Sequence, residues 1–139
     1  MRIMGIDYGD TRVGIALSDP LEITAQGHTT LLNKVYPRML DALLGIVAEY
    51  NVQKIVLGMP KNLNGTSGDR VEVTKSFYAD LKKRLPDMEI VLWDERLTTV
   101  QAAGILNVTN TRGKDRKNVI DTVAASIILQ SYLDYLKGE

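Results

Sequence analysis

Three carboxylates occupy positions from which they could act together on one phosphate. Asp7 closes a short apolar stretch, Glu95 directly follows another, and Asp121 stands near the start of a long helical pattern. Residues 3, 5 and 7 share one face of an extended strand, which places Asp7 at the strand tip. Asp121 leads the apolar stripe of its helix, because Ala124, Ala125, Ile128 and Tyr132 follow at helical spacing. A carboxylate turned toward a core is costly unless it is paired or bound to a cation.

If these acids converge, their chemistry points to a metal. Clustered carboxylates repel one another and raise one another's pKa values unless a cation neutralises them. Oxygen-only ligands favour Mg²⁺ or Mn²⁺, and two such ions can activate water and stabilise a leaving oxygen in phosphodiester hydrolysis. The pattern therefore indicates a metal-dependent phosphoryl-transfer site. Plainer interpretations stay open: Asp7 as a turn residue, Glu95 in a solvated acidic turn, and Asp121 placed by the helix dipole.

The elements that must position these acids follow from the spacing of apolar residues. We expect strands at residues 2–8, 12–18, 22–31, 54–59 and 89–93, the first two forming a hairpin around residues 9–11. Helical spacing predicts helices at 36–50, 69–84 and 118–136, and a short one that begins at Thr98 or Thr99 and ends at Leu106. Three successive strands followed by alternating helices and strands predict one α/β domain over residues 1–139. Its mixed sheet should carry helices on both faces.

Composition excludes several classes of site. The chain has 139 residues, 17 Lys and Arg against 17 Asp and Glu, no cysteine and one histidine, His28. Disulfides, thiolate zinc sites, cysteine nucleophiles and multi-histidine metal sites are therefore ruled out. No apolar run approaches the roughly 20 residues of a membrane span, so we expect a cytoplasmic protein without a membrane partner.

Four motifs together resemble one protein family. They are residues 5–14 (GIDYGDTRVG), 56–65 with its VLGMP start and NG end, 94–99 (DERLTT) and 121–125 (DTVAA). In this order and spacing they resemble the YqgF (RuvX) family, described as Holliday junction resolvases and as pre-16S ribosomal RNA nucleases. The resemblance runs from Met1 to about Leu136.

The resemblance implies both a fold and a reaction. The fold is RNase H-like, with a five-stranded mixed sheet of three antiparallel and then parallel strands. The activity is cleavage of phosphodiester bonds in 5′-end maturation of pre-16S ribosomal RNA. Asp7, Glu95 and Asp121 match the catalytic carboxylates of the family, which bind Mg²⁺ or Mn²⁺.

Several basic residues are candidates for holding nucleic-acid phosphates. Residues 112–117 (RGKDRK) carry a net charge of +3, at the place where the family has a basic loop before the last helix. Other cations lie just beyond predicted strand ends. The full set is Arg12, Lys61, Arg96, Arg112, Lys114, Arg116 and Lys117. A solvated charge run is the alternative for the basic segment, and we expect Tyr8, Trp93 and His28 to be structural.

Other functions remain open on sequence alone. A Holliday junction resolvase acting on DNA and a non-catalytic nucleic-acid-binding module both fit the fold. An actin-like phosphotransferase shares the first hairpin motif but needs two domains. Because the net charge is zero, we expect weak, metal-assisted binding of nucleic acid, precursor ribosomal RNA before DNA junctions. A partner or a weak homodimer would assist it.

Overall fold

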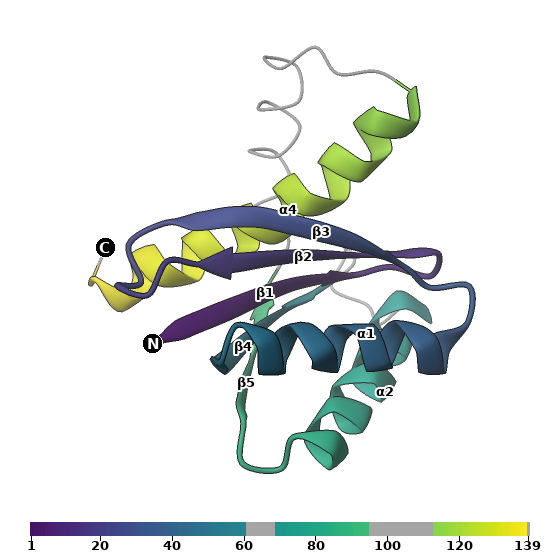
Figure 1. The fold of residues 1–139 in the computed structure, drawn as a ribbon, viewed down its shortest axis with the longest axis horizontal. Helices are drawn as coiled ribbons and strands as arrows, with labels where there is room; N and C mark the ends of the chain where they lie inside the picture. The colour runs from purple at the N-terminus through teal and green to yellow at the C-terminus, as the bar shows by residue number, and fades with distance from the viewer. Residues whose placement is uncertain (61–68, 95–112, 139) are drawn as a thin grey trace.

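Five strands and three helices make up the part of the chain that the computed structural model describes, which is residues 1–60, 69–94 and 113–138 (Figure 1). The strands are β1 (Arg2–Tyr8), β2 (Arg12–Ser18), β3 (Ala25–Leu32), β4 (Val52–Met59) and β5 (Glu89–Asp94). The helices are α1 (Tyr36–Glu49), α2 (Asp69–Arg84) and α4 (Gly113–Leu136).

The strands form one mixed sheet in the order β3-β2-β1-β4-β5. The pairs β1–β2 and β2–β3 are antiparallel, whereas β1–β4 and β4–β5 are parallel. This confirms the predicted mixed sheet with three antiparallel and then parallel strands. Because β1, β4 and β5 run in the same direction, their carboxyl ends meet at one edge, where open α/β sheets bind ligands.

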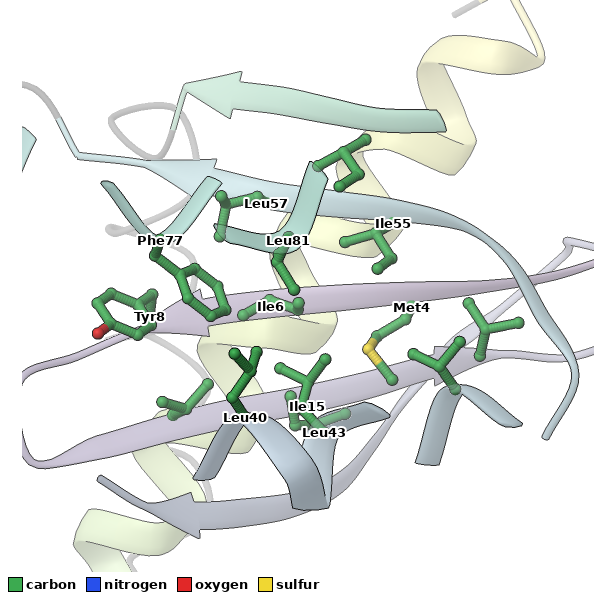
Figure 2. Packing of buried hydrophobic residues seen from close by; sticks show 14 of the residues in the cluster. Met4, Ile6, Tyr8, Ile15, Leu40, Leu43, Ile55, Leu57, Phe77 and Leu81 are labelled. Atoms are coloured by element: carbon green, nitrogen blue, oxygen red, sulfur yellow. The ribbon is translucent and has the colours of Figure 1, made fainter. Parts of the chain in front are cut away.

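Successive side chains of β1 point to opposite faces of the sheet and pack into two separate hydrophobic cores. Met4, Ile6 and Tyr8 pack beneath α1 and α2, and the ring of Tyr8 stacks on Phe77 of α2 with centroids 4.1 Å apart (Figure 2). Ile3 faces the other side, where it belongs to a cluster with residues of α4. Helices therefore cover both faces, as predicted.

Two glycines let α4 lie unusually close to the sheet. A Cβ at Gly5 of β1 would stand 2.8 Å from Leu129 Cβ and 2.9 Å from the Ala125 carbonyl oxygen. A Cβ at Gly27 of β3 would stand 2.9 Å from Thr122 Cβ. Both distances are shorter than a real side chain tolerates, so the absence of a side chain sets the height of α4 above β1 and β3.

The predicted start of β3 was wrong, because a side chain folds the preceding segment into a turn. The Asp19 carboxylate accepts hydrogen bonds from the backbone N–H groups of Leu21, Ile23 and Thr24, at 2.7 to 3.1 Å. Glu22 takes a left-handed backbone conformation with φ of 61°. The strand therefore begins at Ala25 instead of Glu22.

The final helix also begins earlier than predicted, at Gly113 instead of Asn118. The basic segment after Arg112 therefore belongs to the first turns of α4 and is not a loop. Lysine and arginine are good helix formers, so the high charge of this segment is not evidence for a loop. The predicted helix ending at Leu106 lies outside the described residues. None of the described helices is long and apolar enough to cross a membrane.

Candidate functional site

Asp7 is the penultimate residue of the central strand β1, and it lies on the face of the sheet that α4 covers. It is half-buried, and it shares this face with Ile3 and Gly5, which pack under α4. On β2 its partner is Gly14. On β4, Leu57 pairs with Ile6, so the next residue, Gly58, lies next to Asp7. Neither neighbouring strand thus places a side chain beside this carboxylate, which leaves bare backbone on both sides of it.

The second predicted acid, Glu95, lies outside the described residues. The strand that leads to it, β5, is separated from β1 by β4: Trp93 of β5 pairs with Gly58, and Asp94 pairs with Met59. Asp94, the last described residue before Glu95, therefore lies at the same edge of the sheet as Asp7.

The backbone of Asp121 belongs to α4, on the Asp7 face of the sheet. It precedes Ala125 by four residues, about one helical turn and about 6 Å along the axis. Ala125 in turn meets Gly5, which precedes Asp7 by one strand repeat of about 6.6 Å. Gly5 and Ala125 are in contact, and the backbone of Asp7 lies two strand residues from Gly5 while that of Asp121 lies one helical turn from Ala125. Among the side chains that the structure describes there is no group of three metal-ligating residues. Those of Glu95 and Asp121 are outside that set.

Two residues that the sequence did not single out hold the chain just after Asp7. Arg70 of α2 donates a hydrogen bond from Nη2 to the Tyr8 carbonyl oxygen at 2.8 Å. Asn33 donates from Nδ2 to the Gly9 carbonyl oxygen at 3.0 Å and to the Tyr8 hydroxyl at 3.3 Å. These contacts fix the strand tip from outside the hairpin. No local sequence signal distinguishes Arg70 from any surface arginine on a helix.

Of the predicted nucleic-acid-binding residues, Arg12 is the one whose side chain the structure describes. It begins β2, is half-buried and pairs through its backbone with Leu32 of β3. Lys114, Arg116 and Lys117 have their backbones in the first turns of α4. Lys61, Arg96 and Arg112 lie outside the described residues.

Each of the three aromatic residues that we expect to be structural contacts another ring of the fold. Tyr8 is buried in its stack on Phe77. Trp93 donates from Nε1 to Ser131 Oγ at 3.2 Å and packs edge-on against Tyr132. The ring of His28 meets Tyr50 edge-on, with centroids 4.9 Å apart.

The fold belongs to a known class. The structure of Thermus thermophilus RuvC superposes with a TM-score of 0.60 at 11% sequence identity, covering 99% of this chain and 97% of that one. A Fowlpox virus resolvase in complex with Holliday junction DNA superposes with a TM-score of 0.58 at 16% identity, covering 98% and 99%. At such identities the likeness concerns the fold alone, an RNase H-like fold with a five-stranded mixed sheet.

Sequence comparison then identifies the family. The model of the family described as "RuvX: Holliday junction resolvase" matches residues 1–135. A Halothermothrix orenii protein named "Putative pre-16S rRNA nuclease" is 49% identical over 135 residues, covering 97% of this chain and 96% of that protein. A relative of the same name from Agathobacter rectalis is 48% identical over 141 residues, covering 99% and 98%. The chain belongs to the RuvX family, as the four motifs indicated.

Proposed function

We propose that this protein is a divalent-metal-dependent endonuclease whose catalytic carboxylates are Asp7, Glu95 and Asp121. The observation that carries the proposal is the position of Asp7, at the tip of the central strand with glycine on both neighbouring strands. The helix that bears Asp121 packs on the same face, through Ala125 against Gly5.

The donor set suits Mg²⁺ or Mn²⁺. All three residues offer only carboxylate oxygens, which these hard cations prefer, and glycines flank Asp7 on both neighbouring strands. When bound, the metal lowers the pKa of water and offsets negative charge on the phosphate. The chain supplies the placement: Arg70 and Asn33 hold the strand tip, and the two glycine contacts hold α4.

Precursor 16S ribosomal RNA is the substrate we propose, because the relatives at 49% and 48% identity carry that name. The second candidate is a DNA Holliday junction, favoured by the family description and by a T. thermophilus RuvC structure in complex with such a junction. In either case the basic residues Arg12, Lys61, Arg96, Arg112, Lys114, Arg116 and Lys117 would contact phosphates.

Replacing Asp7 by asparagine tests the mechanism. Asp7→Asn keeps the size of the side chain and removes its charge, so we expect cleavage in Mg²⁺ or Mn²⁺ to fall by about 100-fold or more. Binding of Mn²⁺, measured by calorimetry, should weaken in parallel. The matched control is Asp87→Asn, the same change at an exposed residue in the turn after α2, which should cleave like the wild type.

Precursor ribosomal RNA and junction DNA are assayed side by side, and thermal unfolding confirms that both variants fold. Full cleavage by Asp7→Asn would refute the catalytic assignment. Cleavage of junction DNA alone would transfer the proposal to the second candidate.

A further inference from the structure

Figure 1 shows β3, an edge strand of the sheet, passing into α1. An open groove is lined by residues of this connection and of the two elements that it joins. Its volume is about 280 Å³. The lining residues are mostly aliphatic, with two cations and no carboxylate among them: Leu31, Leu32, Lys34, Val35, Arg38, Met39 and Ala42. Leu32 is 64% exposed and Val35 is 49% exposed. The groove therefore combines an exposed apolar floor with positive charge.

The two cations of the groove are not neutralised within the described part of the chain. Lys34 and Arg38 are exposed, and neither forms an ion pair or side-chain hydrogen bond with another described residue. Other cations do: Lys54 pairs with Glu89, and Arg84 with Asp41. The first turn of α1 also holds no acidic residue. The lining of the groove therefore carries two positive charges and no negative charge, although the chain as a whole is neutral.

The groove is joined to the hairpin that follows Asp7. Leu32 pairs with Arg12 across the β2–β3 ladder, and the backbone N–H of Asn33 donates to the Thr11 carbonyl oxygen at 2.9 Å. The Asn33 side chain bonds to Gly9 as well. The groove lies on the α1 side of the sheet and Asp7 lies on the α4 face, so a strand of nucleic acid that contacts both must pass over the tip of this hairpin.

We propose that this groove binds a single-stranded stretch of the nucleic-acid substrate, outside the bond that is cleaved. Lys34 and Arg38 contact its phosphates, and a base or ribose lies on Leu32 and Val35. This inference rests on the proposed nuclease function. Unpaired cations attract phosphates of any nucleic acid, but an apolar floor is useful only for bases that are not already stacked in a duplex. Continuity with the Asp7 hairpin favours substrate over an acidic protein segment as the occupant.

Binding to a labelled single-stranded oligoribonucleotide and to a blunt RNA duplex tests the inference, with fluorescence anisotropy followed over a series of salt concentrations in EDTA. Each phosphate contact on a single strand contributes about 0.7 to the slope of log K against log salt. Lys34→Gln with Arg38→Gln should therefore lower the slope for the single strand by about 1.4. That change corresponds to a roughly 25-fold weaker affinity near 0.1 M salt.

Two further variants distinguish the effect of the groove's positive charge from that of its apolar contacts. Lys75→Gln with Lys83→Gln makes the same change of charge at exposed positions of α2 and should leave single-strand affinity nearly unchanged. Leu32→Ser removes one of the two exposed apolar side chains of the floor, so it should weaken single-strand binding without changing the salt slope. Thermal unfolding of each variant checks that the fold is kept.

The inference is wrong if the Lys34 and Arg38 double variant binds the single strand like the α2 control, or if it loses single-strand and duplex affinity equally. It is also wrong if RNA binding persists while binding of polyglutamate is lost, because the groove would then suit an acidic protein segment. Cleavage by the wild type in Mn²⁺ is scored separately. If the wild type cleaves and the double variant binds the single strand normally, the groove inference is wrong and the proposed function is unaffected. If the wild type does not cleave, the proposed function is wrong.

Discussion

Replacing Gly5 by alanine places a methyl group between β1 and α4 where there is no space for it. The new Cβ would stand 2.8 Å from Leu129 Cβ and 2.9 Å from the Ala125 carbonyl oxygen. Neither neighbour is the end of a flexible side chain, because both belong to or adjoin the helix backbone. The helix must therefore move outward, or the strand must bend, before alanine fits.

The expected loss follows from two opposing effects. Inserting a methyl group into a well-packed core costs about 1–3 kcal/mol. Alanine also restricts the unfolded chain, which returns about 0.4–1 kcal/mol. We expect Gly5→Ala to lower the free energy of unfolding by about 1–2 kcal/mol. The matched control is Gly45→Ala in α1, where a Cβ would meet nothing within 4 Å, so the same change should stabilise the helix by about 0.5–1 kcal/mol.

Urea unfolding followed by circular dichroism measures both variants, and thermal unfolding should show the same opposite signs. If the proposed site is correct, cleavage by Gly5→Ala should fall further than its folded fraction does, since displacing α4 displaces Asp121 relative to Asp7 and misplaced catalytic groups lose rate steeply. A Gly5→Ala protein as stable as Gly45→Ala would refute the close approach of α4 to β1.

Two further predictions concern the α1 and α2 face and the turn before β3. Phe77 is 1% exposed and stacks on Tyr8, so Phe77→Ala should cost about 3–5 kcal/mol in urea unfolding; a loss below about 1 kcal/mol would show that the stack is not part of the core. The backbone N–H groups of Thr24, Ile23 and Leu21 hold the pKa of Asp19 below its ordinary value of 3.8. Its carboxylate therefore stabilises the fold above that pH and loses this effect as the pH falls through the lowered pKa. The melting-temperature difference between wild type and Asp19→Asn should shrink from about pH 5 to about pH 2, and a constant difference would contradict this account.

Much of the fold was predictable because local signals agreed with one another. The hairpin strands at 2–8 and 12–18 and the helix at 69–84 have the predicted bounds, since clear apolar periods are punctuated there by glycine and proline. The placement of Asp7 on the face opposite Tyr8 also followed from the strand repeat.

The predictions failed where long-range or side-chain contacts decide the local structure. The turn before β3 depends on hydrogen bonds to Asp19 that residue types alone do not reveal. The start of α4 was placed too late because the basic segment at residues 112–117 was interpreted as a loop. Arg70 and Asn33 act on the hairpin from distant positions in the chain, so only the folded structure identifies them.

The order of the elements along the chain has a consequence for how the protein is made. All five strands precede α4, yet one face of the sheet, with Ile3, Ala16 and Val56, is buried largely by that helix. During synthesis the sheet can assemble from the amino-terminal side, as domains generally do, but this apolar face stays uncovered until residues 125–133 have left the ribosome. A nascent chain would thus carry Asp7 for most of its synthesis before Asp121 is added. If the proposed site is correct, cleavage competence would arise only at the end of translation, together with the burial of the second core.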